Sequence, residues 1–169
     1  MGYTHYWRRP RPDGEHYHIH SAYMFGNLAL DALKIIKQAE INGIRIRDAY
    51  GENEPEFNEA QFGINGDATA FVDGRDLAHE SFIWEGIPAV SLLRKDEPET
   101  FDFCKTAYKP YDAVVTAILI RAKHIYGKYV SVSSDGEWSE WQAGRELYET
   151  VFGEVAECPF TLTTSFEQR

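Results

Sequence analysis

Hydrophobic and polar positions alternate at the start of the chain and then change to a helical spacing. Residues 3–7 are aromatic or β-branched around one histidine, which predicts a first strand that stops before Pro10. Between residues 21 and 41, apolar side chains recur on one face of a 3.6-residue repeat and polar ones on the other, which predicts an amphipathic helix. Residues 44–47 alternate again and predict a short strand.

The middle of the chain predicts short strands separated by polar loops. Residues 49–59 are polar and acidic and predict a loop. Residues 61–65 and 81–84 predict two neighbouring strands joined by a long loop that is rich in aspartate. Residues 100–104 alternate phenylalanine with smaller residues and predict a further strand.

The last third of the chain predicts two more helices. Residues 110–127 begin with proline, end with glycine and are apolar nearly all round, which predicts a buried central helix. Residues 129–133 predict a strand, and residues 138–152 a last amphipathic helix with its tryptophans inward. Residues 158–169 predict an edge strand or a frayed end.

The order of these elements predicts the fold class. Strands and helices do not alternate strictly, so a parallel sheet of βαβ units is not indicated. We predict an α+β fold in which about three helices pack on one face of a mostly antiparallel sheet. With 169 residues, 43% of them hydrophobic, the chain fits a single domain over residues 1–169.

The charge of the chain is strongly negative, at −10. Eight acids lie between Asp135 and Arg169, and a second acidic cluster comprises Asp48, Glu52, Glu54, Glu56 and Glu59. Such a field repels phosphates, so direct binding of nucleic acid is not expected over most of the surface. The exception is a short basic stretch formed by Arg8, Arg9 and Arg11.

The cysteines and the apolar segments bear on the cellular compartment in which we expect the protein. Cys104 and Cys158 are far apart and lack the spacing of a metal site, and the N-terminus does not resemble a signal peptide. We therefore expect free thiols and a cytoplasmic protein. The longest apolar run, residues 113–120, is too short to span a bilayer, so we expect no membrane role.

Two groups of histidines are candidate sites. His16, His18 and His20 would share one face of a strand, but no carboxylate is placed beside them by the spacing, and we predict no metal site. His79 and Glu80 would serve as a general base with its orienting carboxylate, or as metal ligands. The alternative for this pair is a polar loop end that bonds to the backbone.

Residues 103–112 are the most informative stretch, because they leave a strand and open a helix. Lys105, Thr106 and Lys109 would stand beside the first backbone amides of that helix, where a phosphate or carboxylate can be held. In the alternative, Asp112 caps the helix, the lysines are solvated and Tyr111 packs inside. Cys104 is either a nucleophile activated by these surroundings or a buried strand cysteine.

The common catalytic motifs are missing from the sequence. The nucleophile elbow, the zinc-protease helix, the dinucleotide-binding glycines, the phosphate-binding P-loop and paired Cys-x-x-Cys are all absent. Whether the protein is an enzyme, and which cofactor it uses, is therefore left open.

Several blocks occur together in a specific order. They are Tyr3-Thr4-His5-Tyr6-Trp7, Ile64-Asn65-Gly66, His79-Glu80-Ser81-Phe82, Phe103-Cys104-Lys105-Thr106, Lys109-Pro110-Tyr111-Asp112 and Ser133-Ser134-Asp135-Gly136. In this combination, over residues 2 to about 153, the chain resembles a family of small uncharacterised proteins of tailed bacteriophages and prophages. The resemblance implies a phage or prophage origin and an intracellular setting, and it brings no activity with it. It also implies that the polar residues of these blocks form the site.

Three functions are compatible with these observations, and the sequence favours the first. It is a phage or prophage accessory protein, in counter-defence or host takeover, that binds a small anionic, nucleotide-like ligand where the blocks converge. Lysines would hold the phosphate, the first strand would stack on or bond a base, and the 79–80 pair would transfer protons. The predicted binding residues are His5, Trp7, Lys105, Thr106, Lys109, Tyr111, Asp112 and Asp135, and the predicted catalytic residues are His79 and Glu80.

The other two functions need no pocket. An acidic interaction module would occupy a basic nucleic-acid groove on a host protein and inhibit it, although acidic surfaces also simply keep proteins soluble. A minor virion component is the third. The oligomeric state is not indicated by the sequence.

Overall fold

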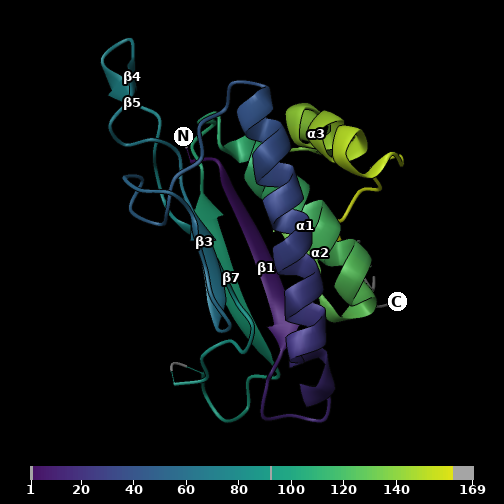
Figure 1. Cartoon of the computed structure of the whole chain (residues 1–169). Helices are drawn as coiled ribbons and strands as arrows, with labels where there is room; N and C mark the ends of the chain where they lie inside the picture. The colour runs from purple at the N-terminus through teal and green to yellow at the C-terminus, as the bar shows by residue number, and fades with distance from the viewer. Residues whose placement is uncertain (1, 92, 162–169) are drawn as a thin grey trace, which may run out of the picture.

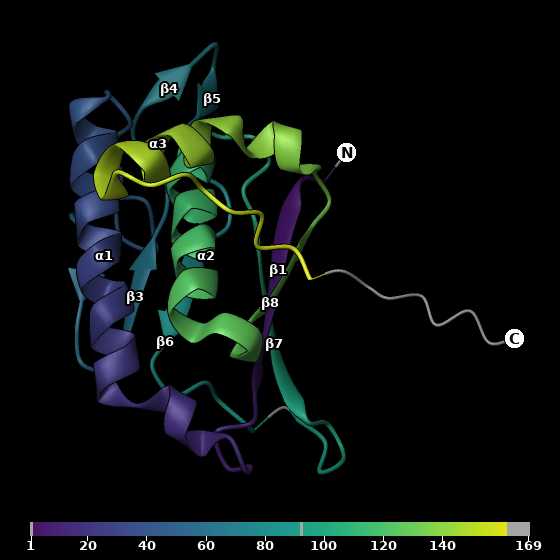
Figure 2. The ribbon, with the colours of Figure 1, turned by 90° about the vertical axis from the view of Figure 1, so that its right-hand side faces the viewer.

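Three α-helices form one layer of the molecule in the computed structural model, which describes residues 2–91 and 93–161 (Figures 1 and 2). They are α1 (Ala22–Ile41), α2 (Asp112–Tyr126) and α3 (Gln142–Phe152). Helix α2 packs against both of the others and is buried along most of its length, as its apolar sequence predicts. Three short 3₁₀ segments flank the helices: η1 (Tyr17–His20), η2 (Gly127–Tyr129) and η3 (Trp138–Trp141).

Two small antiparallel sheets and a hairpin lie on the side of the molecule opposite to the helices (Figure 1). In the first sheet, β1 (Thr4–Pro10) lies between β7 (Glu99–Lys105) and β8 (Ser131–Ser134). In the second, β3 (Gln61–Ile64) lies between β2 (Glu56–Phe57) and β6 (Phe82–Glu85). Strands β4 (Phe71–Val72) and β5 (Arg75–Asp76) form a hairpin that projects at one end of the molecule.

The predicted fold class is confirmed: the chain is α+β, with antiparallel strands and three helices on one side. The strands, however, form two three-stranded sheets instead of one. The predicted strand at residues 44–47 is wrong, because only an isolated bridge between Arg47 and Asn65 forms there. The first strand also runs three residues further than predicted and includes Pro10 as its last member.

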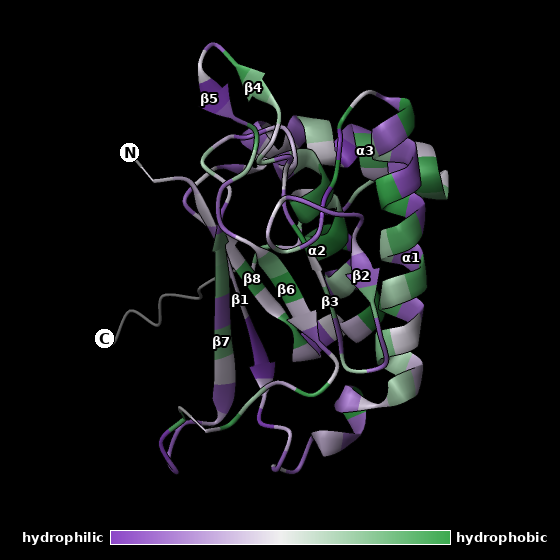
Figure 3. Ribbon diagram, turned by 60° about the vertical axis from the view of Figure 1, so that its left-hand side comes forward, coloured by the Kyte–Doolittle hydropathy of each residue, from purple (hydrophilic) through white to green (hydrophobic). Residues whose placement is uncertain are grey.

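Side chains of β1 alternate between the two faces of the first sheet and join it to the second. Trp7 points inward, where its ring lies 5.0 Å from that of Phe82 and 6.1 Å from that of Trp84. Arg9 is also inward and only 1% exposed. Its guanidinium covers the Trp84 ring at 4.3 Å and donates to the Glu85 carbonyl at 2.7 Å. Apolar positions therefore concentrate between the strands and the helices (Figure 3).

The C-terminal segment returns to the first sheet after α3. Phe160 forms a parallel bridge with Val132, and the Thr161 amide donates to the Val132 carbonyl at 3.1 Å. Within the described residues only this isolated bridge forms at the predicted edge strand, and residues 162–169 lie outside the described part of the chain. No helix in the described part has the length and the apolar character that crossing a membrane requires.

Candidate functional site

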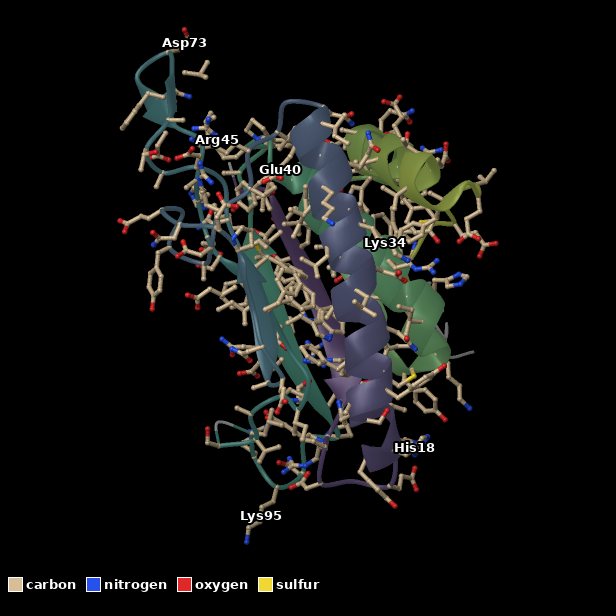
Figure 4. The ribbon with its side chains drawn as sticks, in the orientation of Figure 1. His18, Lys34, Glu40, Arg45, Asp73 and Lys95 are labelled. Carbon is tan, nitrogen blue, oxygen red and sulfur yellow. The ribbon has the colours of Figure 1, made fainter. Side chains whose placement is uncertain are left out.

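An open cleft of about 630 Å³ lies at the base of the β4–β5 hairpin. We call it the hairpin cleft. It is lined by residues from four separate segments: Tyr50, Asn65, Ala68, Phe71, Gly74, Arg75, Asp76, Ala78, His79, Glu80 and Lys109. Figure 4 shows Asp73 at the tip of the hairpin and Arg45 near its base. The cleft thus brings together three of the predicted site residues, namely His79, Glu80 and Lys109.

Asn65 holds the loops that form the floor of this cleft. Its amide nitrogen donates to the carbonyls of Ala49 and His79, at 3.3 and 2.9 Å, and its amide oxygen accepts from the His79 and Gly66 amides. Gly66 follows directly, and a side chain there would overlap the Leu77 carbonyl. The chain can pass so closely only because this residue is glycine.

His79 is exposed and its ring orientation is determined by the backbone. Nδ1 lies 2.8 Å from the carbonyl oxygen of Lys105. Because a carbonyl only accepts, Nδ1 carries the proton and donates it, and the neutral ring keeps its lone pair on Nε2. The orienting group is therefore a carbonyl, and the prediction that Glu80 orients the imidazole is not what the structure shows.

Glu80 has a structural partner of its own. Its Oε2 accepts from the Lys105 amide at 2.8 Å, and its own amide donates back to the Lys105 carbonyl. The Tyr111 hydroxyl donates to the Glu80 carbonyl at 2.6 Å. These bonds fasten the chain before β6 to the end of β7 and place the carboxylate at the inner wall of the cleft.

Two cations line the cleft. Lys109 donates from Nζ to the Asp76 carbonyl at 2.5 Å and lies 4.0 Å from the Asp76 carboxylate. Arg75 is exposed, and within residues 2–91 and 93–161 it has no ion-pair partner. Sequence reasoning missed Arg75, because nothing in its local pattern separates it from a solvated hairpin residue.

A buried carboxylate lies beneath the hairpin. Asp67 has no exposed surface, and its Oδ1 accepts from the Thr69 hydroxyl at 2.6 Å and from the Thr69 amide at 2.8 Å. Its Oδ2 lies 3.1 Å from Arg45 and 3.5 Å from Arg47. The Thr69 bonds and the two guanidinium groups hold the pKa of Asp67 well below its usual range.

Several of the predicted binding residues meet elsewhere, in a buried polar network at the start of α2. His5 lies with Nε2 2.6 Å from Asp112 Oδ1 and with Nδ1 2.9 Å from Ser134 Oγ. The Thr106 hydroxyl donates to the same Asp112 oxygen at 2.5 Å. The Asp112 carboxylate can only accept, so His5 Nε2 donates to it; in this tautomer Nδ1 accepts the hydroxyl proton of Ser134, whose Oγ also accepts from the Gly136 amide.

This arrangement has the residue types of a Ser-His-Asp triad, but its geometry is that of a structural network. His5 has no exposed surface, and its ring lies edge-on to the rings of Tyr3 and Trp141. Ser134 Oγ already accepts bonds from the Gly136 amide and, at 3.4 Å, from Trp141 Nε1. A nucleophile needs a free lone pair, and both lone pairs of Ser134 Oγ already accept hydrogen bonds.

The remaining predicted residues do not join the hairpin cleft. Trp7 and Tyr111 are each 1% exposed, so the prediction that Trp7 stacks on a ligand is wrong. His5 and Thr106 have no exposed surface and are also unable to contact a ligand. Asp135 is exposed, but its carboxylate accepts from the Thr4 amide and the Tyr6 hydroxyl, both at 3.0 Å.

The N-terminus of α2 is not the anion site that the sequence suggested. The amides of Asp112, Ala113 and Val114 donate to the carbonyls of Lys109, Pro110 and Tyr111. The Asp112 carboxylate is turned toward His5 and makes no cap bond. Lys105 does not line the cleft, because it lies at the end of β7 with its side-chain carbons beside Gly2.

Cys104 is a buried strand residue, as one of the two alternatives predicted. Burial raises the pKa of its thiol to about 12, and the thiol donates to the Glu80 carbonyl at 3.4 Å. A thiol in that state is a poor nucleophile. The activated-nucleophile alternative is therefore wrong.

The histidines of η1 lie at the opposite end of the molecule from the hairpin, as His18 and Asp73 show in Figure 4. They do not share a strand face, because this segment is a 3₁₀ turn. His20 is buried with Nε2 2.7 Å from the Pro10 carbonyl. Over the described residues, no three His, Cys, Asp or Glu side chains are arranged to hold a metal ion.

The chain was compared with known proteins in three ways. No protein-family model, no curated protein and no solved structure matches it.

Proposed function

We propose that this chain binds a small anionic ligand, of the size of a nucleotide, in the hairpin cleft. The observation that carries the proposal is the convergence on one cleft of Arg75 and His79, from the segment that contains the hairpin, with Lys109, which lies about 30 residues further along the chain. Its volume of about 630 Å³ lies within the range of small-molecule sites.

The hydrogen bonds of the two acids at the cleft favour an anion over a cation. Glu80 Oε2 is occupied by the Lys105 amide, and Asp76 Oδ1 by the Ala78 amide at 3.1 Å. The Arg75 guanidinium has five donors, and the Lys109 ammonium keeps two of its three after bonding Asp76. The cleft holds two acids as well as two cations, and the free donors of Arg75 and Lys109 are the groups that suit phosphate or carboxylate oxygens.

His79 adds a group that can change its role. With Nδ1 donating to Lys105, Nε2 accepts a proton when the ring is neutral and donates a hydrogen bond when the ring is charged. In this proposal the imidazole bonds the ligand and accepts a proton if the ligand reacts. Asn65, whose donors and acceptor are already used, supports the site without contacting the ligand.

The biological setting rests on the sequence resemblance alone. We propose a phage or prophage accessory role, in counter-defence or host takeover, and the cytoplasm of the host cell as its compartment. The acidic interaction module remains the alternative, and four acids of its proposed cluster, Glu52, Glu54, Glu56 and Glu59, are exposed. Asp48, the first acid of its proposed cluster, is buried and caps the loop that carries Tyr50 and Glu52.

The proposal is tested by thermal unfolding with a panel of anions: pyrophosphate, adenosine mono- and diphosphate, and cyclic dinucleotides. A ligand at about a hundred times its Kd stabilises the folded state by about 2.7 kcal/mol. For a chain of this length we expect the Tm to rise by roughly 5–10 °C. Titration calorimetry then gives the Kd and the stoichiometry.

The decisive variant is Arg75→Ala, because its side chain is exposed and makes no ion pair in the described structure, so that the fold should not suffer. We expect it to weaken binding at least tenfold. Arg94→Ala, an exposed arginine in another loop, is the matched control and should bind as the unchanged protein does. The proposal is abandoned if no anion raises the Tm, or if R75A binds as well as R94A.

A further inference from the structure

The face of the first sheet that points away from the helices carries a band of aromatic rings. In the register of the sheet, Phe103, Tyr6 and Ser133 lie in one row, and Phe101, Arg8 and Ser131 lie in the next. Residues directly opposite each other share a face, so these six side chains form a continuous surface. We call it the outer sheet face. Figure 3 shows β7 at the edge of the strands, with its alternating hydropathy.

The rings on this face are exposed although they are large and apolar. Phe101 is 45% exposed and Phe103 is 54% exposed. Tyr6 lies 6.0 Å from Phe101 with the two rings within 18° of parallel, and its hydroxyl is tethered to Asp135. These large apolar side chains remain exposed on the strand surface, and burial in the protein's own core does not explain them.

The charge of the outer sheet face differs from that of the rest of the chain. Acids outnumber lysine and arginine 27 to 17 overall. On the outer sheet face, by contrast, the cations Arg8 and Lys105 stand against two acids, Glu99 and Asp135, whose carboxylate bonds the Tyr6 hydroxyl, so the face is close to neutral. Of the N-terminal arginines, Arg9 is buried and Arg11 pairs with Asp13, whereas Arg8 is exposed with its guanidinium 4.6 Å from the centre of the Phe101 ring.

We propose that the outer sheet face binds single-stranded nucleic acid, with two or three bases stacked on Tyr6, Phe101 and Phe103. Aromatic side chains on an open sheet accept any base by its π-face, and neighbouring cations hold the backbone phosphates. The two serines of β8 supply hydroxyl groups beside the rings. A groove of about 240 Å³ between β1 and β8, lined by Tyr6, Arg8, Ser131, Ser133 and Thr161 among others, lies beside the rings.

The two cations beside the rings favour this occupant over a purely apolar partner surface. A single strand can bring its phosphates to Arg8 and Lys105 and its bases to the rings. A rigid duplex would also bring its second backbone against the acidic remainder of the protein, where it is repelled. The face therefore favours flexible, unpaired strands, and it uses neither the hairpin cleft nor the ligand proposed for it.

The test is fluorescence anisotropy with a short labelled oligothymidine, compared with a duplex of the same length. We expect the single strand to bind more tightly than the duplex. Phe101→Ala and Phe103→Ala should each weaken binding by about tenfold, since stacking on one ring typically contributes that factor or more. Phe71→Ala is the matched control, because this phenylalanine is 66% exposed and lines the hairpin cleft.

Salt dependence gives a second readout that misfolding cannot imitate. With two cations in contact, the logarithm of the binding constant should fall with the logarithm of salt concentration with a slope of about −1.4. Arg8→Gln should reduce that slope by about 0.7. Phe103→Trp should keep binding and show a tryptophan emission that falls as the oligonucleotide is added.

Three results would overturn the proposal. They are no binding of the single strand, equal losses of binding in F71A and F101A, and an F101A variant that loses self-association of the protein and leaves oligonucleotide binding unchanged. The last would appear in sedimentation as a dimer that F101A converts to monomers, and it would assign the face to a second copy of the chain. Arg75→Ala separates the two proposals, because it should abolish anion binding in the cleft and leave oligothymidine binding intact.

Discussion

His5 Nε2 lies 2.6 Å from the Asp112 carboxylate, although 107 residues separate the two in sequence. Their contact joins the middle strand of the first sheet to the start of the buried helix α2. Thr106 and Ser134 add bonds from the ends of β7 and β8. One short network therefore fastens all three strands of this sheet to α2.

Asp112→Ala should lower the free energy of unfolding by about 3 kcal/mol, because it leaves His5 Nε2 and the Thr106 hydroxyl buried without their acceptor. Urea unfolding followed by circular dichroism measures the change. Asp96→Ala is the matched control, since this acid is 78% exposed in its side chain and should change stability by less than about 0.5 kcal/mol. Equal effects of D112A and D96A would show that the network contributes little.

Asp67 should make the protein sensitive to acid. Its pKa is depressed in the folded state, so the stability that it contributes is present above the unfolded-state pKa of about 3.9 and is lost as the pH falls through the lower folded-state value. Asp67→Asn should therefore be less stable than the unchanged protein at pH 7, and the difference should shrink between about pH 5 and pH 2.

The measurement is a series of urea titrations across that pH range on both proteins. Other carboxylates with depressed pKa values, such as Asp48 and Glu154, are common to the two proteins, so their effects cancel in the difference. A difference that stays constant with pH would contradict the assigned role of the Asp67 charge.

Local patterns in the sequence predicted the helices and most strands, because burial of one face imposes a period that can be read along the chain. They could not predict which strands pair, since the partners of β1 lie about 95 and 129 residues away and nothing local identifies them. The false strand at 44–47 shows the limit: Ile46 is buried as alternation requires, but a single bridge to Asn65 is all that forms.

The site was predicted only in part for related reasons. Tyr6 and Trp7 are both aromatic, so alternation in β1 does not reveal which faces the core, and Trp7 was placed on the wrong face. His79 is oriented by a backbone carbonyl, which no side-chain pattern encodes. Arg75 lines the cleft because the folded chain brings the β4–β5 hairpin and Lys109 to the same place. Residues near Arg75 in the sequence do not indicate this.

The two cysteines should react very differently. Cys104 is buried with its thiol pKa raised to about 12, whereas Cys158 is exposed. Iodoacetamide at pH 8 should therefore add one group to the native protein and two in urea, as counted by intact mass. Cys158→Ser should remove the native adduct. Rapid labelling of Cys104 in the folded protein would show that β7 opens readily at this position.

Two glycines in helices should respond oppositely to alanine. Gly144 of α3 crosses α2 so closely that a side-chain carbon there would overlap the Thr116 hydroxyl and approach the Ala113 carbonyl. Gly26 of α1 has no atom within 4 Å of the position that a side-chain carbon would take. Helix propensity favours alanine over glycine by about 1 kcal/mol at both sites, so only the packing differs.

Gly26→Ala should therefore raise the free energy of unfolding by up to about 1 kcal/mol. Gly144→Ala should lower it by about 2 kcal/mol despite the same gain in propensity, because α3 must move away from α2. Thermal unfolding should separate the two variants by roughly 6–12 °C in Tm. If G144A were as stable as G26A, α2 and α3 would have to pack less closely than the structure shows. Adding Thr116→Ala to G144A should restore part of the loss, because it removes the hydroxyl that the new methyl group meets.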